Sequence, residues 1–163
     1  MPQQHQSIDE GMIKYKGRYS IKQYMPNKPI KRGMKVWMRC DSVSGFCHDF
    51  RINIGRFDEF RGVGLGAKVV KHLTRDIKGK NFHIVMDNFF SSVNLFRTLK
   101  QNGIQATGTI KKNAVFLPEC VRTPNPKLQR GDSVARQHGD LVATAWQDTK
   151  QVTNICSSHN NYI

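Results

Sequence analysis

The chain has 163 residues, 38% of them hydrophobic, which is enough for one domain with a buried core and short for two. Its 26 Lys and Arg residues against 12 Asp and Glu residues give a formal net charge of +14, which favours polyanionic partners, above all nucleic acid. No apolar stretch approaches the roughly 18 residues of a membrane helix, and the amino terminus lacks a secretory pattern. We therefore expect an intracellular protein with no membrane partner.

The first predicted strand, residues 7–13, carries two adjacent carboxylates, Asp9 and Glu10. Neighbouring residues of a strand point to opposite faces of the sheet, so the two side chains are not expected to share a site. We take Asp9 as the candidate and expect Glu10 on the other face. A solvent-facing residue without a chemical role is the alternative for Asp9.

Basic residues fill the next segment, between Gly11 and Cys40, where no acidic residue occurs. Tyrosines and Trp37 are interleaved with them, as in surfaces that pair phosphate contacts with packing on bases or sugars. For a single residue, a solvated basic loop over core aromatics is the simpler interpretation, but for the whole segment we expect contact with nucleic acid. The residues expected to bind DNA are Lys14, Lys16, Arg18, Lys22, Lys28, Lys31 and Arg32, and Lys35 and Arg39 continue the series.

Within this segment, residues 24–29 are predicted to form a loop, because each of its prolines lacks a backbone donor and restricts the residue before it. Over 35–40, Val36, Met38 and Cys40 alternate with Lys35, Trp37 and Arg39, and over 46–54 mostly apolar residues again occupy every other position. A Gly-containing turn at 42–45 separates the two runs. Period-two alternation around such a turn predicts an antiparallel β-hairpin.

Apolar residues recur at helical spacing over 65–73 and again over 93–99, which predicts two amphipathic helices. The first is expected to end before Gly79 and the second before Gly103, since glycine is common just past a helix end. The glycine-rich run 62–66 matches neither the dinucleotide nor the P-loop spacing. We interpret it as the turn that enters the first helix.

Between these helices, the short apolar run 82–86 predicts an inner strand that places Asp87 at its carboxyl end. Open α/β sheets bind ligands at this edge, and Asp9 and Asp87, one from each of two strands, suggest a metal pair. Without a metal, Asp87 would cap the helix expected to begin near Ser91. His83 alternates towards one face of the sheet and is expected to be packed rather than catalytic.

The run 104–110 predicts a further strand, so the order strand, hairpin, helix, strand, helix, strand fits a mixed α/β sheet with covering helices. Beyond Lys111, prolines mark an irregular stretch, and short β-like runs follow it, the last two joined by a turn at Asp148. These runs are 133–137, 141–146 and 152–156. We therefore predict a core over 1–111 and a β-rich region over 112–163.

The cysteines give no sign of a metal site, because no Cys-x-x-Cys pair and no histidine pair at zinc spacing occurs. No Ser-His-Asp or Cys-His arrangement is evident from the spacing either. We expect the four cysteines to be reduced and structural. They are Cys40, Cys47, Cys120 and Cys156.

A set of motifs resembles the piggyBac transposase family and occurs in the order of that family. The set runs through nearly the whole chain, so it is far more specific than any single motif. The motifs are Ser7–Glu10, Lys16–Arg18, Tyr24–Pro29, Gly64–Gly66, Met86–Ser92, Ala106–Thr109, and Leu141–Ala143 with Trp146.

The resemblance implies a ribonuclease-H-like mixed sheet with flanking helices, followed by a β-rich insertion region. It also implies a core that cuts and joins DNA at TTAA sites with three aspartates and Mg²⁺ (or Mn²⁺). By this resemblance, Asp9 and Asp87 correspond to the first and second catalytic, metal-binding aspartates. A nuclear location, DNA as partner, and association with a second copy or with a full-length transposase are further expectations.

The chain departs from the family pattern at its end, because it stops before the Gly-Gly-Val-Asp type motif that carries the third aspartate. Asp132, Asp140 and Asp148 lie in turn-like contexts and are not candidates for that role. We therefore expect a piece of a transposase that binds DNA and is inactive alone. The alternatives are an enzyme completed by a partner chain or by further sequence, and a non-catalytic, domesticated module that binds nucleic acid or chromatin.

Overall fold

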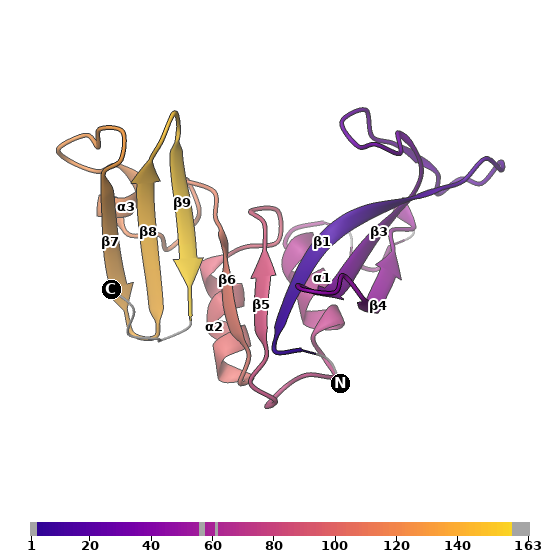
Figure 1. Cartoon of the computed structure of the whole chain (residues 1–163), viewed down its shortest axis with the longest axis horizontal. Coiled ribbons are helices and arrows are strands. Elements are labelled where there is room, and N and C mark those ends of the chain that lie inside the picture. The colour runs from indigo at the N-terminus through magenta and orange to yellow at the C-terminus, as the bar shows by residue number, and fades with distance from the viewer. Residues whose placement is uncertain (1–2, 56–57, 61, 158–163) are drawn as a thin grey trace.

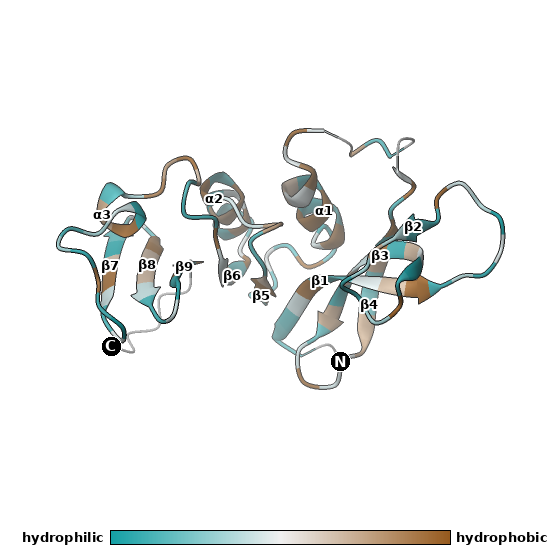
Figure 2. Cartoon of the chain, turned by 90° about the horizontal axis from the view of Figure 1, so that it is seen from above, coloured by the Kyte–Doolittle hydropathy of each residue, from teal (hydrophilic) through white to brown (hydrophobic). Residues whose placement is uncertain are grey.

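The computed structural model describes residues 3–55, 58–60 and 62–157. Over these residues the chain forms one twisted β-sheet with its helices gathered on one face (Figure 1, Figure 2). The strands are β1 (His5–Lys14), β2 (Gln23–Tyr24), β3 (Arg32–Asp41), β4 (Cys47–Ile52), β5 (His83–Met86), β6 (Gln105–Thr109), β7 (Ser133–His138), β8 (Leu141–Gln147) and β9 (Gln151–Cys156). The helices are α1 (Leu65–Leu73), α2 (Val93–Gln101) and α3 (Glu119–Arg122).

The sheet is mixed, with a parallel centre and antiparallel flanks. Its spatial order across the described residues is β2-β3-β1-β5-β6-β9-β8-β7, and β4 pairs with β3 beside this path. β5 is parallel to both β1 and β6, whereas the remaining pairs are antiparallel. The β5–β6 connection passes through α2, as a parallel pair requires a crossover. The mixed α/β fold predicted from the sequence is confirmed.

The core lies between the sheet and the two longer helices. α1 begins at Leu65, within the run 62–66 predicted as its entry turn, and buries Val69, Val70 and Leu73 against the sheet. α2 likewise buries residues one turn apart, among them Phe96 and Leu99. Each such side chain stabilises the fold by about 1.5–3 kcal/mol when fully buried. Both predicted amphipathic helices are therefore confirmed.

The predicted hairpin is formed by β3 and β4, but alternate positions with polar character are buried in it beside apolar Val36. Trp37 and Arg39 are 0% and 2% exposed, whereas Met38 and Cys40 lie half-buried on the opposite face. Arg39 is accommodated by hydrogen bonds from its guanidinium to buried acceptors. Trp37 and Arg39 thus belong to the core, and the nucleic-acid contact expected for the basic segment does not extend to them.

The C-terminal strands β7, β8 and β9 occur where the sequence predicts them, and β8 and β9 form the expected hairpin. They continue the same sheet, because β9 pairs with β6, with Cys156 opposite Thr107. The short helix α3, which follows Pro118, is not predicted from the sequence. The predicted boundary between the core and the β-rich region, at residues 111 and 112, stays a prediction. The hydrogen-bonded pairing of β6 with β9 joins the two regions across it.

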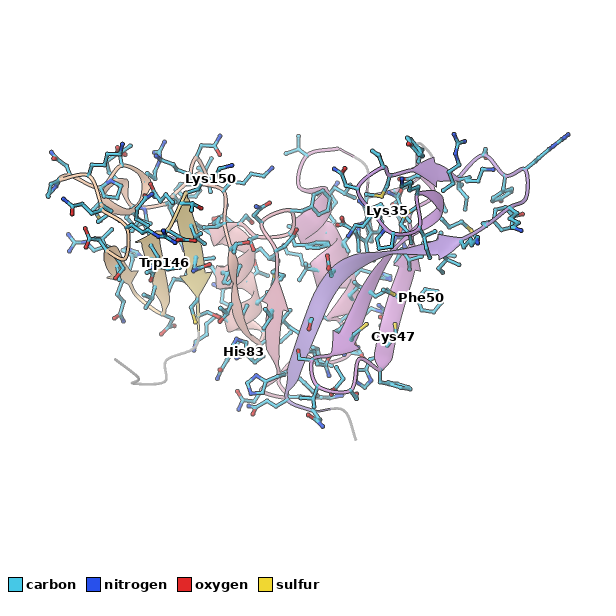
Figure 3. All side chains as sticks on the ribbon, turned by 45° about the horizontal axis from the view of Figure 1, so that its top comes forward. Lys35, Cys47, Phe50, His83, Trp146 and Lys150 are labelled. Carbon is cyan, nitrogen blue, oxygen red and sulfur yellow. The ribbon has the colours of Figure 1, made fainter. Side chains whose placement is uncertain are left out.

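The face of the sheet opposite the helices is uncovered over the described residues (Figure 2). Figure 3 looks onto it from the upper edge, and Phe50 and Trp146 project from it. Phe50, Val85 and Trp146 are 56%, 42% and 44% exposed. Within the described ranges no helix is both long and apolar enough to cross a lipid bilayer.

Candidate metal and nucleic-acid site

Asp9 and Asp87 lie next to each other at the centre of the sheet. Ile8 and Met86 are the last paired residues of the parallel β1–β5 ladder, and each aspartate is the next residue along its chain. Adjacent strands are about 4.8 Å apart, so the two residues leave the ladder side by side. Ile8 and Met86 point into the core, so Asp9 and Asp87 are directed to the uncovered face, where both are exposed.

Each aspartate uses one carboxylate oxygen to order its own backbone. Oδ1 of Asp9 accepts a hydrogen bond of 2.7 Å from the Glu10 amide, and Oδ1 of Asp87 accepts one of 2.9 Å from the Phe89 amide. The described residues provide no hydrogen-bond partner for either Oδ2. The site therefore offers two carboxylate oxygens from neighbouring strands to a ligand in solvent.

Asp87 does not cap α2, contrary to the alternative weighed from the sequence. The N-cap is Ser92, whose Oγ accepts a hydrogen bond of 3.2 Å from the Leu95 amide. The Asp87 carboxylate instead closes a turn to Phe89, and Asp87 lies six residues before α2 begins at Val93. Because a serine already fills the capping position, the Asp87 side chain is not needed to begin the helix.

Two glycines hold the turn after Asp87 in place. A Cβ on Gly66 of α1 would overlap the carbonyl oxygen of Phe89 and lie 2.8 Å from Cα of Phe90. A Cβ on Gly108 of β6 would lie 2.9 Å from Oγ of Ser91. Phe90 itself is buried at 1% exposure. The turn is thus clamped between α1 and β6, which fixes the position of Asp87 relative to Asp9.

Glu10 lies on the other face of β1, as expected, and forms an ion pair with Lys28 at 3.3 Å. It therefore does not join Asp9 and Asp87. No group of three or more His, Cys, Asp or Glu side chains able to hold a metal ion occurs within residues 3–55, 58–60 and 62–157. The site has two carboxylates and no third ligand among these residues.

The predicted DNA-binding residues run from Lys14, the last residue of β1, to Arg32, the first of β3, along a segment that projects beyond one end of the sheet (Figure 1). Five of them are exposed: Lys14, Lys16, Arg18, Lys31 and Arg32. The other two are half-buried and hold the segment together. Lys22 donates to the Gly17 carbonyl at 3.2 Å, and Lys28 pairs with Glu10. The structure thus separates five exposed cations, of which Arg32 lies over the Tyr24 ring at 5.0 Å, from two half-buried ones with hydrogen-bond or ion-pair partners.

Sequence reasoning passed over Lys35 as a contributor to the carboxylate site. Its Nζ lies 5.1 Å from the ring centre of Phe89, so the ammonium group lies over the turn that follows Asp87. A cation over an aromatic ring is stabilised by about 0.5–1 kcal/mol at an exposed position. Lys35 belongs to the basic run in the sequence, but only the folding of β3 against β1 brings it to this turn.

Further cations frame the same edge of the sheet. Lys111 and Lys112 follow the carboxyl end of β6, and Lys150 lies in the β8–β9 turn. All three are exposed, and Figure 3 shows Lys150 and Lys35 along the upper edge. The two aspartates therefore lie at a sheet edge with positive charge on both sides, an arrangement suited to a phosphate backbone.

Comparison with known proteins identifies the class to which this fold and site belong. A family model described as Transposase IS4 matches residues 1–162. The human PiggyBac transposable element-derived protein 3 is 31% identical over 157 residues, and the human PiggyBac transposable element-derived protein 2 is 29% identical over 164 residues. The chain therefore belongs to the piggyBac branch of this transposase family, which confirms the resemblance seen in the sequence.

A solved structure gives the same result at the level of the fold. The chain superposes on piggyBac transposase from a cryo-EM structure of its synaptic complex with hairpin DNA, with a TM-score of 0.88 and 29% sequence identity over 99% of this chain. The chain spans 34% of that transposase chain and 26% and 27% of the two human relatives. It thus corresponds to one part of longer proteins.

Proposed function

We propose that this chain is a DNA-binding piece of a transposase core that retains two of three catalytic aspartates and does not cleave DNA alone. The placement of Asp9 and Asp87 carries the proposal, because both leave adjacent parallel strands at a sheet edge framed by lysines. The exposed cations between β1 and β3 supply the phosphate contacts. TTAA as target sequence and residence in the nucleus belong to the proposal as well.

The donor set at this edge fits a divalent metal. Mg²⁺ and Mn²⁺ prefer oxygen ligands, and Oδ2 of Asp9 and Oδ2 of Asp87 are the oxygens that would hold the ion. When bound, such an ion activates an attacking water or 3′-hydroxyl group and stabilises the leaving oxygen. The hydrogen bonds from the Glu10 and Phe89 amides keep the two carboxylates oriented before any ion arrives.

The site has no third carboxylate among the described residues, which limits what it can do. Two-metal phosphoryl transfer requires ions about 3.5–4 Å apart, and two carboxylates provide one weak site rather than two ions in register. Among the described residues no further acidic, histidine or cysteine group completes the set. Cleavage would therefore require a ligand from a second copy, a full-length transposase or sequence outside this chain.

Metal binding tests the site directly. We expect Mn²⁺ to bind the folded chain weakly, with the signal lost in Asp9→Asn and in Asp87→Asn, measured by electron paramagnetic resonance. Asp132→Asn is the matched control, because it removes an exposed acidic side chain of the β-rich region. Equal Mn²⁺ binding by all four proteins would reject Asp9 and Asp87 as ligands.

Activity on DNA separates the proposal from its enzymatic rival. A duplex that contains TTAA is incubated with Mn²⁺ and either the wild-type chain or Asp87→Asn. We expect binding of the duplex by both proteins and nicking or strand transfer by neither. Activity present in the wild type and lost in Asp87→Asn would instead show an enzyme whose third ligand comes from elsewhere.

A non-catalytic, domesticated binding module is the second candidate. The observation that favours it is that, among the described residues, none of the five exposed cations forms a hydrogen bond or ion pair with Asp9 or Asp87. In such a module the affinity for DNA would be the same with and without Mn²⁺. The proposed transposase core predicts tighter binding when Mn²⁺ is present.

A further inference from the structure

Cys40 and Cys47 face each other across the β3–β4 hairpin. They are direct partners in the antiparallel ladder, next to the irregularity that follows Arg39. Directly opposed residues of an antiparallel pair have Cα atoms about 4.5–5.5 Å apart. A disulfide requires a Cα separation of about 4.4–6.8 Å, so the backbone already has the spacing that a bond between these two residues needs.

The two side chains also share one face of the hairpin, as directly opposed residues do. Both thiols are free, and Cys47 Sγ donates to the Asp49 carbonyl at 3.5 Å. Met38 and Cys40 lie on the uncovered face, two residues apart on β3, and Figure 3 shows Cys47 on that same face. No helix separates the pair from solvent, because all the helices among the described residues lie on the opposite side of the sheet.

The two thiols differ in their surroundings. Cys47 is exposed, whereas Cys40 is half-buried. Burial, followed by the neighbouring Cys47, raises the pKa of Cys40 to about 11. Cys40 therefore remains protonated at neutral pH. Cys47 is the thiol that an oxidant in solution reaches first, and Cys40 is the neighbouring thiol that can then react with the oxidised Cys47.

We propose that Cys40 and Cys47 form an oxidation-sensitive pair that a peroxide converts into an intramolecular disulfide. This goes beyond the proposed DNA-binding role and does not depend on it. The other two cysteines lie elsewhere: Cys156 is opposite Thr107 and Val142, with its Sγ 3.1 Å from Oγ1 of Thr107, and Cys120 is in α3. In a reducing compartment such a bond is transient and reports oxidation rather than holding the fold.

The chemistry proceeds in two balanced steps. The Cys47 thiolate attacks one oxygen of hydrogen peroxide, the O–O bond breaks, and uptake of one proton gives a Cys47 sulfenic acid and water. The Cys40 sulfur then attacks the Cys47 sulfur, the S–O bond breaks and the S–S bond forms. The hydroxide released takes the Cys40 proton, so two thiols and one peroxide yield one disulfide and two waters.

The disulfide would link β4, at the edge of the sheet, to β3, which pairs with the strand that carries Asp9. Cys40 lies opposite Ser7 of β1, two residues before Asp9, and the Asp9 charge contributes to the raised pKa of Cys40. β4 is an edge strand among the described residues, paired only with β3. A disulfide between Cys47 and Cys40 would therefore hold β4 to β3 at the first residue of β4, close to β1, which carries Asp9.

Peptide mapping tests the proposal on the folded chain. The protein is treated with hydrogen peroxide, its remaining thiols are alkylated, and the digest is examined by mass spectrometry. We expect a peptide that links Cys40 to Cys47 and disappears on reduction with dithiothreitol. Two of the four thiols should be lost to alkylation in the oxidised chain.

Variants distinguish this pair from general oxidation. Cys47→Ser should give no internal disulfide and leave Cys40 open to alkylation, whereas the matched control Cys156→Ser should form the Cys40–Cys47 bond like the wild type. Circular dichroism checks that both variants fold. The peptide map of the wild-type chain tests the proposal independently of the variants. Cys47 found as a sulfinic acid beside a free Cys40, or linked to a second chain, would overturn the proposal.

Discussion

Arg39 illustrates how single polar residues are accommodated inside this sheet. Its Nε donates to the Leu73 carbonyl at 2.6 Å, and Nη1 donates to Oε1 of Gln6 at 2.6 Å. Its Nη2 reaches the carboxylate of Asp76 at 2.8 Å. Every side of the guanidinium thus has an acceptor, so the residue joins β1, β3 and the end of α1.

Replacing Arg39 should destabilise the fold through the acceptors left behind. In Arg39→Met the carbonyl of Leu73 and the amide oxygen of Gln6 stay buried without a donor, and an unsatisfied buried group costs about 1–3 kcal/mol. Urea unfolding should show a loss of this size. Arg75→Met is the control, because Arg75 is half exposed in its ion pair with Asp49, and such pairs contribute about 1 kcal/mol or less. Equal losses in both variants would contradict this account.

His83 is a second single residue that affects stability, because it makes the free energy of unfolding depend on pH. Burial, and then the charge of His5 beside it, lower the pKa of His83 below its usual 6.5 in the folded state. The two rings lie 5.3 Å apart, and His83 Nε2 lies 2.9 Å from Oγ1 of Thr107. The unfolded chain therefore binds the proton more readily, so this contribution to stability is fully present above pH 6.5 and is lost as the pH falls below it.

The corresponding experiment compares urea unfolding between about pH 7.5 and pH 5. We expect the wild type to lose stability over this range and His83→Gln to lose less, because the buried imidazole is gone. His138→Gln, which changes an exposed histidine of β7, should follow the wild type. A pH dependence unchanged in His83→Gln would show that other groups govern it.

At the scale of whole elements, local patterns in the sequence predicted most of the structure. Period-two and helical spacings depend on burial of one face, and they identified the hairpin, α1, α2 and the C-terminal strands. The buried face of β3 could not be predicted, because Arg39 is buried only through partners on β1 and α1. The adjacency of Asp9 and Asp87 likewise follows from the strand order, which joins residues far apart in the chain.

The contact between α1 and the turn after Asp87 depends on Gly66. Gly66→Ala would favour an isolated helix by about 1 kcal/mol, but the added Cβ would overlap the Phe89 carbonyl and approach Phe90. Overpacking of this kind costs about 1–3 kcal/mol, so we expect a net loss of stability. Lys68→Ala, an exposed position on the same helix, provides the control.

Gly66→Ala also tests whether α1 positions the Asp87 carboxylate. Because the turn carries Asp87, its displacement in Gly66→Ala should weaken Mn²⁺ binding in addition to lowering the unfolding free energy. Lys68→Ala should change neither quantity. Gly66→Ala protein that is destabilised yet binds Mn²⁺ as tightly as the wild type would show that α1 does not position the carboxylate.

For the whole molecule, the arrangement of charge matters more than its total. The sheet carries helices on one face, leaves the other uncovered, and gathers Lys35, Lys111, Lys112 and Lys150 around the edge that holds the two aspartates. The segment between β1 and β3 extends this basic edge outward (Figure 1). Lysines on α1 and in the connection that leads to the amino end of β5 are equally exposed but lie away from this edge.

This asymmetry predicts which cations DNA contacts. One variant changes Lys14 and three residues of the segment between β1 and β3 to Gln, and a control of identical charge changes four on α1 and in the connection that follows it. The first set is Lys14, Lys16, Arg18 and Lys31, and the control set is Lys68, Lys71, Lys78 and Lys80. Each phosphate contact contributes about 0.9 to the slope of log affinity against log salt concentration, so the first variant should lose up to about 3.6 from the slope.

The control should bind with a slope close to that of the wild type, because its lysines lie away from the carboxylate edge. Fluorescence anisotropy of a labelled duplex, measured at several salt concentrations, gives both slopes. Equal decreases in the two variants would mean that DNA responds only to the net charge of +14. A decrease confined to the first set would place the duplex along the basic edge, where its phosphates pass Asp9 and Asp87.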